Sequence, residues 1–129
     1  MWMCGKPLAK SAVGIVGLGR IGLAIARRIQ PFAVERILYS GTTEKHFASE
    51  EDRKFFTFVS FEDLLRKSDF VVIACALNEN TKHLFNRDAF MTMKNDAILV
   101  NIARGGIIDQ DALYEALTTG QIQAAGDLT

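Results

Sequence analysis

Three glycines behind a short apolar run are the residues whose spacing points most clearly to chemistry in this 129-residue sequence. Gly17, Gly19 and Gly22 form a G-x-G-x-x-G pattern between residues 13–16, typical of a strand, and residues 23–29, typical of a helix. There the first glycine allows a tight turn, the second lets the backbone approach a pyrophosphate, and the third lets helix and strand pack closely. The helix N-terminus then attracts the phosphates. A tight loop is the simpler alternative, but the flanking pattern favours dinucleotide binding.

A second loop bears on which dinucleotide is bound. NAD-specific sites usually carry Asp or Glu roughly 20 residues after the glycines, where the carboxylate binds ribose hydroxyls. Here residues 39–45 read Tyr-Ser-Gly-Thr-Thr-Glu-Lys. Hydroxyls, loop N–H groups and a lysine suit a 2′-phosphate, which a carboxylate would repel. We therefore expect NADP to be preferred, with NAD possible; a polar turn with a solvated Glu–Lys pair is the alternative. The expected contacts are Ser40, Thr42, Thr43 and Lys45.

One arginine is the candidate catalytic residue. Residues 101–106 read Asn-Ile-Ala-Arg-Gly-Gly and follow an apolar run, which places Arg104 at the end of an expected strand. A guanidinium stays charged at any working pH and makes bidentate contacts to a carboxylate. Beside a nicotinamide ring, Arg104 would anchor a 2-oxo acid and polarise its carbonyl. A surface arginine in a flexible turn is the alternative interpretation.

Other kinds of chemistry find little support in the sequence. His46 and His83 lie in charged or polar stretches and are interpreted as solvated, and no Cys/His cluster has metal-site spacing. The formal net charge is zero, which argues against a nucleic-acid partner. No apolar stretch approaches the roughly 20 residues of a membrane span. Cys75 is expected to be a small buried side chain; its pairing with Cys4 stays open, but a reducing, cytoplasmic compartment is the simpler expectation.

Strand and helix signals alternate along the chain and predict an α/β, Rossmann-type doubly wound parallel sheet of about six strands, in a single domain over residues 1–129. The expected strands are residues 13–16, 36–40, 55–59, 70–77, 97–102 and 123–125. Three further helices are expected after N-caps Ser60, Asn86 and Asp109. In such a sheet ligands lie beyond the carboxyl ends of the strands. That rule selects the glycine turn and residues 40–45, 76–81 and 102–106.

Residues 13–22, Val-Gly-Ile-Val-Gly-Leu-Gly-Arg-Ile-Gly, taken with residues 101–109, Asn-Ile-Ala-Arg-Gly-Gly-Ile-Ile-Asp, resemble the D-isomer-specific 2-hydroxyacid dehydrogenases. The resemblance covers nearly the whole chain. It implies hydride transfer between a nicotinamide cofactor and a small 2-oxo or 2-hydroxy acid, with Arg104 on the substrate carboxylate and carbonyl. The cofactor contacts that it implies are Gly19, Arg20 and Ile21 at the pyrophosphate, Thr42, Thr43 and Lys45 around the 2′-phosphate, and Ala76, Thr81 and Ile102 at the nicotinamide half.

The sequence also departs from the family. The family's glutamate and proton-donating histidine downstream of the arginine have no counterpart here, nor does the first segment of its second domain. We therefore expect an isolated or truncated cofactor domain that is inactive alone. Residues 125–129 read Ala-Gly-Asp-Leu-Thr instead of the family's Gly-Leu-Asp-Val order, so Asp127 is offset by one residue from a cofactor-contacting position.

Full-length relatives pair through their cofactor domains, which implies a homodimer for a full-length protein. Two alternatives to an enzyme domain stay open. One is a non-catalytic NAD(H)-sensing module of corepressor type, against which the phosphate-friendly residues 40–45 argue. The other is a truncated product with no function beyond residual binding.

Overall fold

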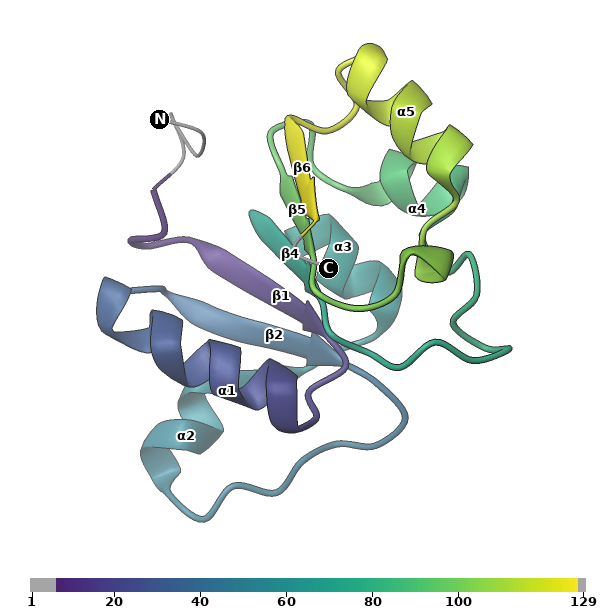
Figure 1. Cartoon of the computed structure of the whole chain (residues 1–129). Helices are drawn as coiled ribbons and strands as arrows, with labels where there is room; N and C mark the ends of the chain where they lie inside the picture. Colours follow the sequence, from purple (N-terminus) through teal and green to yellow (C-terminus); the bar gives the residue numbers. More distant parts are fainter. Residues whose placement is uncertain (1–6, 128–129) are drawn as a thin grey trace.

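Apolar runs at regular intervals along the chain form parallel strands of one sheet in the computed structural model, which describes residues 7–127, with the backbone alone at Asp127 (Figure 1). The strands are β1 (Ala12–Val16), β2 (Arg36–Ser40), β3 (Phe56–Phe58), β4 (Phe70–Ile73), β5 (Ile98–Asn101) and β6 (Ala124–Asp127). Their order in the sheet is β3-β2-β1-β4-β5-β6, and each neighbouring pair is parallel. The predicted doubly wound sheet is confirmed.

Helices cover both faces of the sheet (Figure 1). They are α1 (Arg20–Ile29), α2 (Glu50–Phe55), α3 (Phe61–Lys67), α4 (Arg87–Thr92) and α5 (Gln110–Thr118), with 3₁₀ turns η1 (Gln30–Phe32) and η2 (Gly105–Ile107). Side chains alternate between the faces along each strand. Val13 and Ile15 pack in one core with Ala26 of α1, whereas Val16 packs in the other core with Leu64 of α3.

Side-chain caps begin three of the helices where the sequence predicts them. The hydroxyl of Ser60 accepts the Asp63 N–H at 3.1 Å, and the side chain of Asn86 accepts the Ala89 N–H at 3.0 Å. Asp109 accepts the N–H groups of the first turn of α5. These bonds satisfy donors that have no partner inside the helix, so the caps fix where each helix starts.

Some element boundaries differ from those expected. Strand β4 ends at Ile73 instead of Leu77, because Ala74 and Cys75 lie against the glycine turn and Leu77 lies against Gly106. Helix α1 begins at Arg20, three residues earlier than expected, with Gly19 as its N-cap. Helix α2 was not expected, since it buries no residue and so lacks an apolar stripe.

The order of the strands reverses at the centre of the sheet. Strand β1 pairs with β2 on one side and β4 on the other, and the chain runs outward from this centre in both directions. The loops after β1 and β4 therefore diverge, which opens a crevice at the carboxyl edge of the sheet. This edge is where the sequence predicts the ligand.

Candidate functional site

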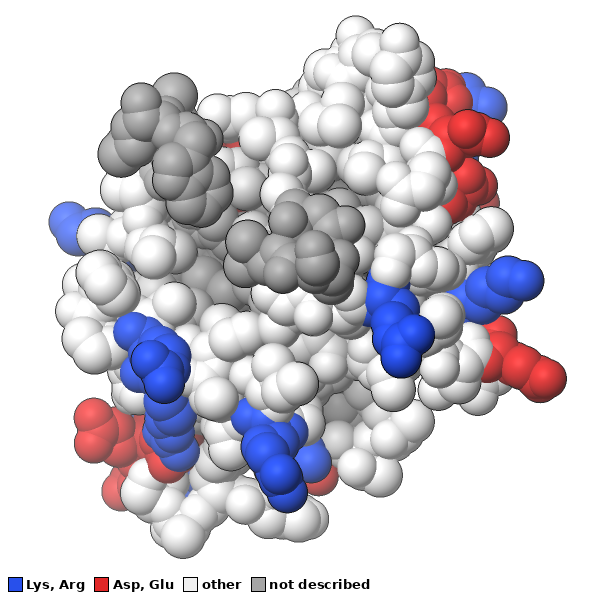
Figure 2. All heavy atoms as spheres, viewed as in Figure 1, with Lys and Arg blue, Asp and Glu red and all other residues white. Residues whose placement is uncertain are grey.

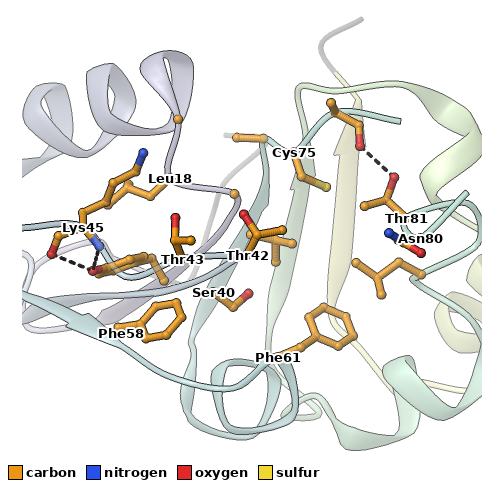
Figure 3. Close-up of a pocket in the computed structure, with 18 of the residues that line it drawn as sticks. Leu18, Ser40, Thr42, Thr43, Lys45, Phe58, Phe61, Cys75, Asn80 and Thr81 are labelled. Atoms are coloured by element: carbon orange, nitrogen blue, oxygen red, sulfur yellow. Dashed lines mark hydrogen bonds between the residues drawn. The ribbon is translucent and has the colours of Figure 1, made fainter. Parts of the chain in front are cut away.

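A cleft of about 1260 Å³ opens at this carboxyl edge, between the loops that follow β1, β2, β3 and β4. Figure 3 shows Lys45 and Thr43 toward one end of the cleft, Asn80 and Thr81 toward the other, and Thr42 and Cys75 between them, with Phe58 and Phe61 along one wall. Three of the four loops selected from the sequence therefore meet in one cavity. None of the described residues that line it carries a carboxylate.

The three glycines of the turn divide into two kinds. Gly17 has φ +93°, and a Cβ there would lie 2.7 Å from the Cα of Cys75. A Cβ at Gly22 would lie 2.5 Å from the carbonyl oxygen of Gly17, so both positions are closed by packing. A Cβ at Gly19 would meet nothing within 4 Å. Gly22 does not line the cleft, whereas Gly19 leaves open space in it.

Helix α1 presents its N-terminus at this open space. Gly19 is its N-cap and offers no side-chain hydrogen bond, and the first turn holds no acidic residue. The first N–H groups of a helix lack intrahelical partners, and the helix dipole makes this end positive. Arg20 and Ile21 are exposed and line the cleft. The arrangement suits a phosphate group, which the N–H groups would bind directly.

The loop after β2 holds the hydroxyl and lysine side chains predicted from the sequence. Ser40 is buried, and its carbonyl accepts the N–H of Gly17 at 2.9 Å, which ties this loop to the glycine turn. Thr42, Thr43 and Lys45 are exposed and line the cleft. This end of the cleft therefore presents hydroxyls and one ammonium group.

The loop after β4 is fixed by a threonine. The hydroxyl of Thr81 donates to the Ala76 carbonyl at 2.7 Å (Figure 3). It also accepts the Asn78 N–H at 2.8 Å. Ala76 and Thr81, both expected cofactor contacts, thus lie together on the cleft wall. Cys75 is half-buried there instead of fully buried, because it faces the cleft.

The Cys75 thiol is free, and burial raises its pKa, against a smaller lowering by a hydrogen bond to its own backbone. The thiol therefore stays protonated near neutral pH. Cys4, the other cysteine, lies outside the described residues.

The predicted site residues that are described in full but absent from the cleft lining are Gly22, Ile102 and Arg104. Arg104 is exposed and precedes η2, directly beyond β5. Ile102 is half-buried, and its N–H donates to the Ile73 carbonyl at 3.1 Å. Asp127 pairs in register with Asn101 at the carboxyl end of β6, and its side chain lies outside the described residues. Arg104, Ile102 and the backbone of Asp127 share the carboxyl edge of the sheet with the cleft.

Sequence reasoning missed part of the site. Phe58 ends β3 and Phe61 begins α3 shortly after it, and both line the cleft. Applying the carboxyl-end rule to β3 would have found them. Asn101 also has a role in the loop that carries Arg104: its side-chain oxygen accepts the Ala103 N–H at 2.9 Å. His83 is exposed, as expected, but has φ +52° and donates its N–H to the Gly106 carbonyl at 2.9 Å.

Residues 7–127 contain no group of three or more His, Cys, Asp or Glu side chains placed to hold a metal ion. No helix among them is both long and apolar enough to cross a bilayer. On the face seen in Figure 2, lysine and arginine side chains form separate groups and not one continuous band.

The fold, the strand order and the glycine turn define a nucleotide-binding domain of the Rossmann type. The family model for the NAD-binding domain of D-isomer specific 2-hydroxyacid dehydrogenases matches residues 1–129, and the chain belongs to that family. The resemblance noted in the sequence is thereby confirmed. Human glyoxylate reductase/hydroxypyruvate reductase is 50% identical over 127 residues, which cover 98% of this chain and 38% of the human protein.

Solved structures of related enzymes have the same fold. A D-isomer specific 2-hydroxyacid dehydrogenase from Lactobacillus delbrueckii ssp. bulgaricus, in its NAD complexed form, matches with a TM-score of 0.85 at 27% identity over 97% of this chain and 37% of that one. An acyclic imino acid reductase, Bsp5, in complex with NADPH and D-Arg, matches with a TM-score of 0.84 at 28% identity over 96% of this chain and 39% of that one. The chain thus spans a little over a third of the length of these relatives. They give no support to the sensor alternative.

Proposed function

We propose that this chain is the cofactor-binding domain of an NADP(H)-dependent reductase that acts on small 2-oxo acids of the glyoxylate and hydroxypyruvate kind. The observation that carries the cofactor choice is a cleft without carboxylates, whose β2 end presents Ser40, Thr42, Thr43 and Lys45. The substrate class rests on the family and on the human relative.

The glycine turn fits the diphosphate of a dinucleotide. The open space at Gly19 leaves room for a phosphate group, and the helix N-terminus supplies N–H donors and a positive dipole. In our proposal the backbone of Gly19, Arg20 and Ile21 binds the diphosphate. Gly17 and Gly22 shape the turn and make no contact of their own with the cofactor.

The loop after β2 fits a ribose that carries a phosphate. An ammonium group and two hydroxyls would bind the 2′-phosphate by charge-assisted hydrogen bonds. Each such bond is worth about 1.5–3 kcal/mol, so NADPH should bind about tenfold or more tightly than NADH. The neighbouring Glu44 is exposed and absent from the cleft lining, so it opposes the phosphate only weakly.

The opposite end of the cleft would receive the nicotinamide, which supplies the hydride when bound. Ala76 and Thr81 would line the ring, with Ile102 beyond them. Arg104 would bind the substrate carboxylate and hold the carbonyl in place; it lies at the same edge but outside the cleft, as a substrate group should. The described residues offer no positioned general acid beside it, so this chain alone should bind cofactor without reducing hydroxypyruvate at a useful rate.

Three further expectations concern the domain organisation, the oligomeric state and the location of the protein. All six strands belong to one sheet, which supports a single domain over residues 1–129. A homodimer of the full-length protein and a cytoplasmic location remain predictions from the sequence. The free thiol of Cys75 is compatible with a reducing compartment.

Titration of this chain with NADPH and NADH tests the cofactor choice. Tighter binding of NADPH is expected, and Ser40→Asp should reverse the order by placing a carboxylate against the 2′-phosphate. Ser40→Asn is the uncharged control of similar size and should keep the preference for NADPH. Equal affinities of the unsubstituted chain for the two cofactors would overturn the proposal.

A further inference from the structure

Residues 41–46, which carry the side chains proposed to bind the 2′-phosphate, are all exposed. Among residues 7–127 the only hydrogen bonds that reach this segment come from one side chain, the phenol of Tyr39. Its oxygen accepts the Lys45 N–H at 2.9 Å, and its O–H donates to the Lys45 carbonyl at 3.4 Å (Figure 3). The Tyr39 hydroxyl thus bonds both the backbone N–H and the backbone carbonyl of Lys45.

The ring of Tyr39 is itself rigidly placed. It is 2% exposed, with its ring centre 5.2 Å from that of Phe58 and 6.5 Å from that of Phe47 in an edge-to-face contact. Phe47 stacks on Phe56 of β3 at 4.6 Å, which fixes the far end of the loop. The loop therefore has apolar anchors on either side of the Lys45 contact.

The phenol is suited to both donate and accept. Burial raises the pKa of Tyr39, the hydrogen bond with the Lys45 backbone lowers it, and the charge of Glu44 raises it further. Since the net shift is upward from an ordinary value near 10, the hydroxyl keeps its proton at any working pH.

We propose that the Tyr39 hydroxyl is the positioning residue for discrimination between NADPH and NADH: it holds the backbone of Lys45 so that the lysine and the two threonines face the 2′-phosphate. This inference rests on the proposed function. A binding loop that is already fixed loses less conformational freedom when its ligand binds, so its affinity for that ligand is higher. Because the loop is proposed to contact the 2′-phosphate, this gain in affinity should apply to NADPH and not to NADH. Tyr39 also lines the cleft, but its hydroxyl is bonded to the loop backbone and in our proposal acts through Lys45.

The test is Tyr39→Phe, which keeps the ring and removes the hydroxyl. We expect the NADPH dissociation constant to rise by about three- to tenfold, as for the loss of one or two hydrogen bonds, and the NADH constant to stay within about twofold. Adenosine 2′,5′-bisphosphate and 5′-AMP, which report on the adenosine end alone, should show the same split. The matched control is Tyr114→Phe, because Tyr114 is 72% exposed on α5 and is absent from the cleft lining.

The outcomes separate this inference from the proposed function. If the unsubstituted chain does not prefer NADPH, the proposed function falls and the inference falls with it. If that preference is present and Tyr39→Phe leaves the NADPH/NADH ratio unchanged, or weakens both cofactors equally, the inference alone is overturned.

Amide hydrogen exchange on the unsubstituted chain gives a second test that does not depend on whether the variant folds. The Lys45 N–H should be protected relative to those of Thr42, Thr43 and Glu44, which have no hydrogen-bond partner among residues 7–127. Exchange of the Lys45 N–H at the rate of its neighbours would overturn the inference that the Tyr39 hydroxyl holds the Lys45 backbone.

Discussion

The glycine turn after β1 and the loop after β2 face the same cleft but are held in place by different means. Backbone contacts fix the turn: Gly17 and Gly22 lie so close to their neighbours that no side chain fits. In the loop a Cβ at Gly41 would meet nothing within 4 Å, and the position of residues 41–46 depends on Tyr39 and Phe47. Under the proposed function, backbone groups of the turn would bind the diphosphate that all dinucleotides share, whereas side chains of the loop would bind the 2′-phosphate that separates NADP from NAD.

The largest effect should come from closing the turn. Gly17→Ala introduces a side chain at φ +93° and 2.7 Å from the Cys75 backbone. Overpacking costs about 1–3 kcal/mol and the left-handed conformation about 1–2 kcal/mol, so the free energy of unfolding should fall by about 2–5 kcal/mol in urea titrations. Gly41→Ala is the control and should change stability by less than about 0.5 kcal/mol. Equal losses in the two variants would break the comparison.

Gly19→Ala should separate binding from folding. Its Cβ meets no protein atom but occupies the space proposed for the diphosphate. Both NADPH and NADH should bind about tenfold more weakly, or about 1.4 kcal/mol, while stability changes by no more than about 1 kcal/mol. Calorimetric titration and thermal melting measure the two. A loss confined to NADPH would place the diphosphate elsewhere.

Substitutions in the loop should affect one cofactor only. Lys45→Ala should weaken NADPH by about tenfold, less at high salt, and leave NADH unchanged. Glu44→Gln removes a like charge near the phosphate and should strengthen NADPH by about twofold. Fluorescence titrations of both variants at two salt concentrations check these changes in affinity. An equal change in NADH affinity would contradict the proposal that the loop contacts only the 2′-phosphate.

The smallest effect concerns an ion pair between α1 and α2, the helices that follow the two regions. Arg27 of α1 donates to both carboxylate oxygens of Asp52 in α2, at 2.6 and 2.8 Å. The hydrogen bond from Arg27 lowers the pKa of Asp52, so the stabilisation exists above the unfolded pKa, about 3.9, and is lost as pH falls through the lower folded value. Asp52→Asn should therefore be less stable at pH 7 and match the unsubstituted chain near pH 2 in urea midpoints.

The features that the sequence predicted correctly are those fixed by local contacts, as in the glycine turn, and the features that it missed depend on contacts with other parts of the fold. Local signals located the glycine turn, the capped helices and the apolar strands, because each depends on neighbours within a few residues. The predicted end of β4 and the predicted burial of Cys75 were wrong. An apolar run in the sequence does not show whether it lies between two strands or lines a cleft. The hydrogen bonds between Tyr39 and Lys45 depend on how the loop folds back on β2, which no local pattern records, whereas the carboxyl-end rule would have found Phe58 and Phe61.

The crystal structure of this chain with NADPH tests the central claim most directly. The account predicts diphosphate oxygens within about 3 Å of the N–H groups of Arg20 or Ile21, and the 2′-phosphate against Thr42, Thr43 and Lys45. A dinucleotide whose diphosphate lies away from the glycine turn, or whose 2′-phosphate points into solvent away from this loop, would contradict it.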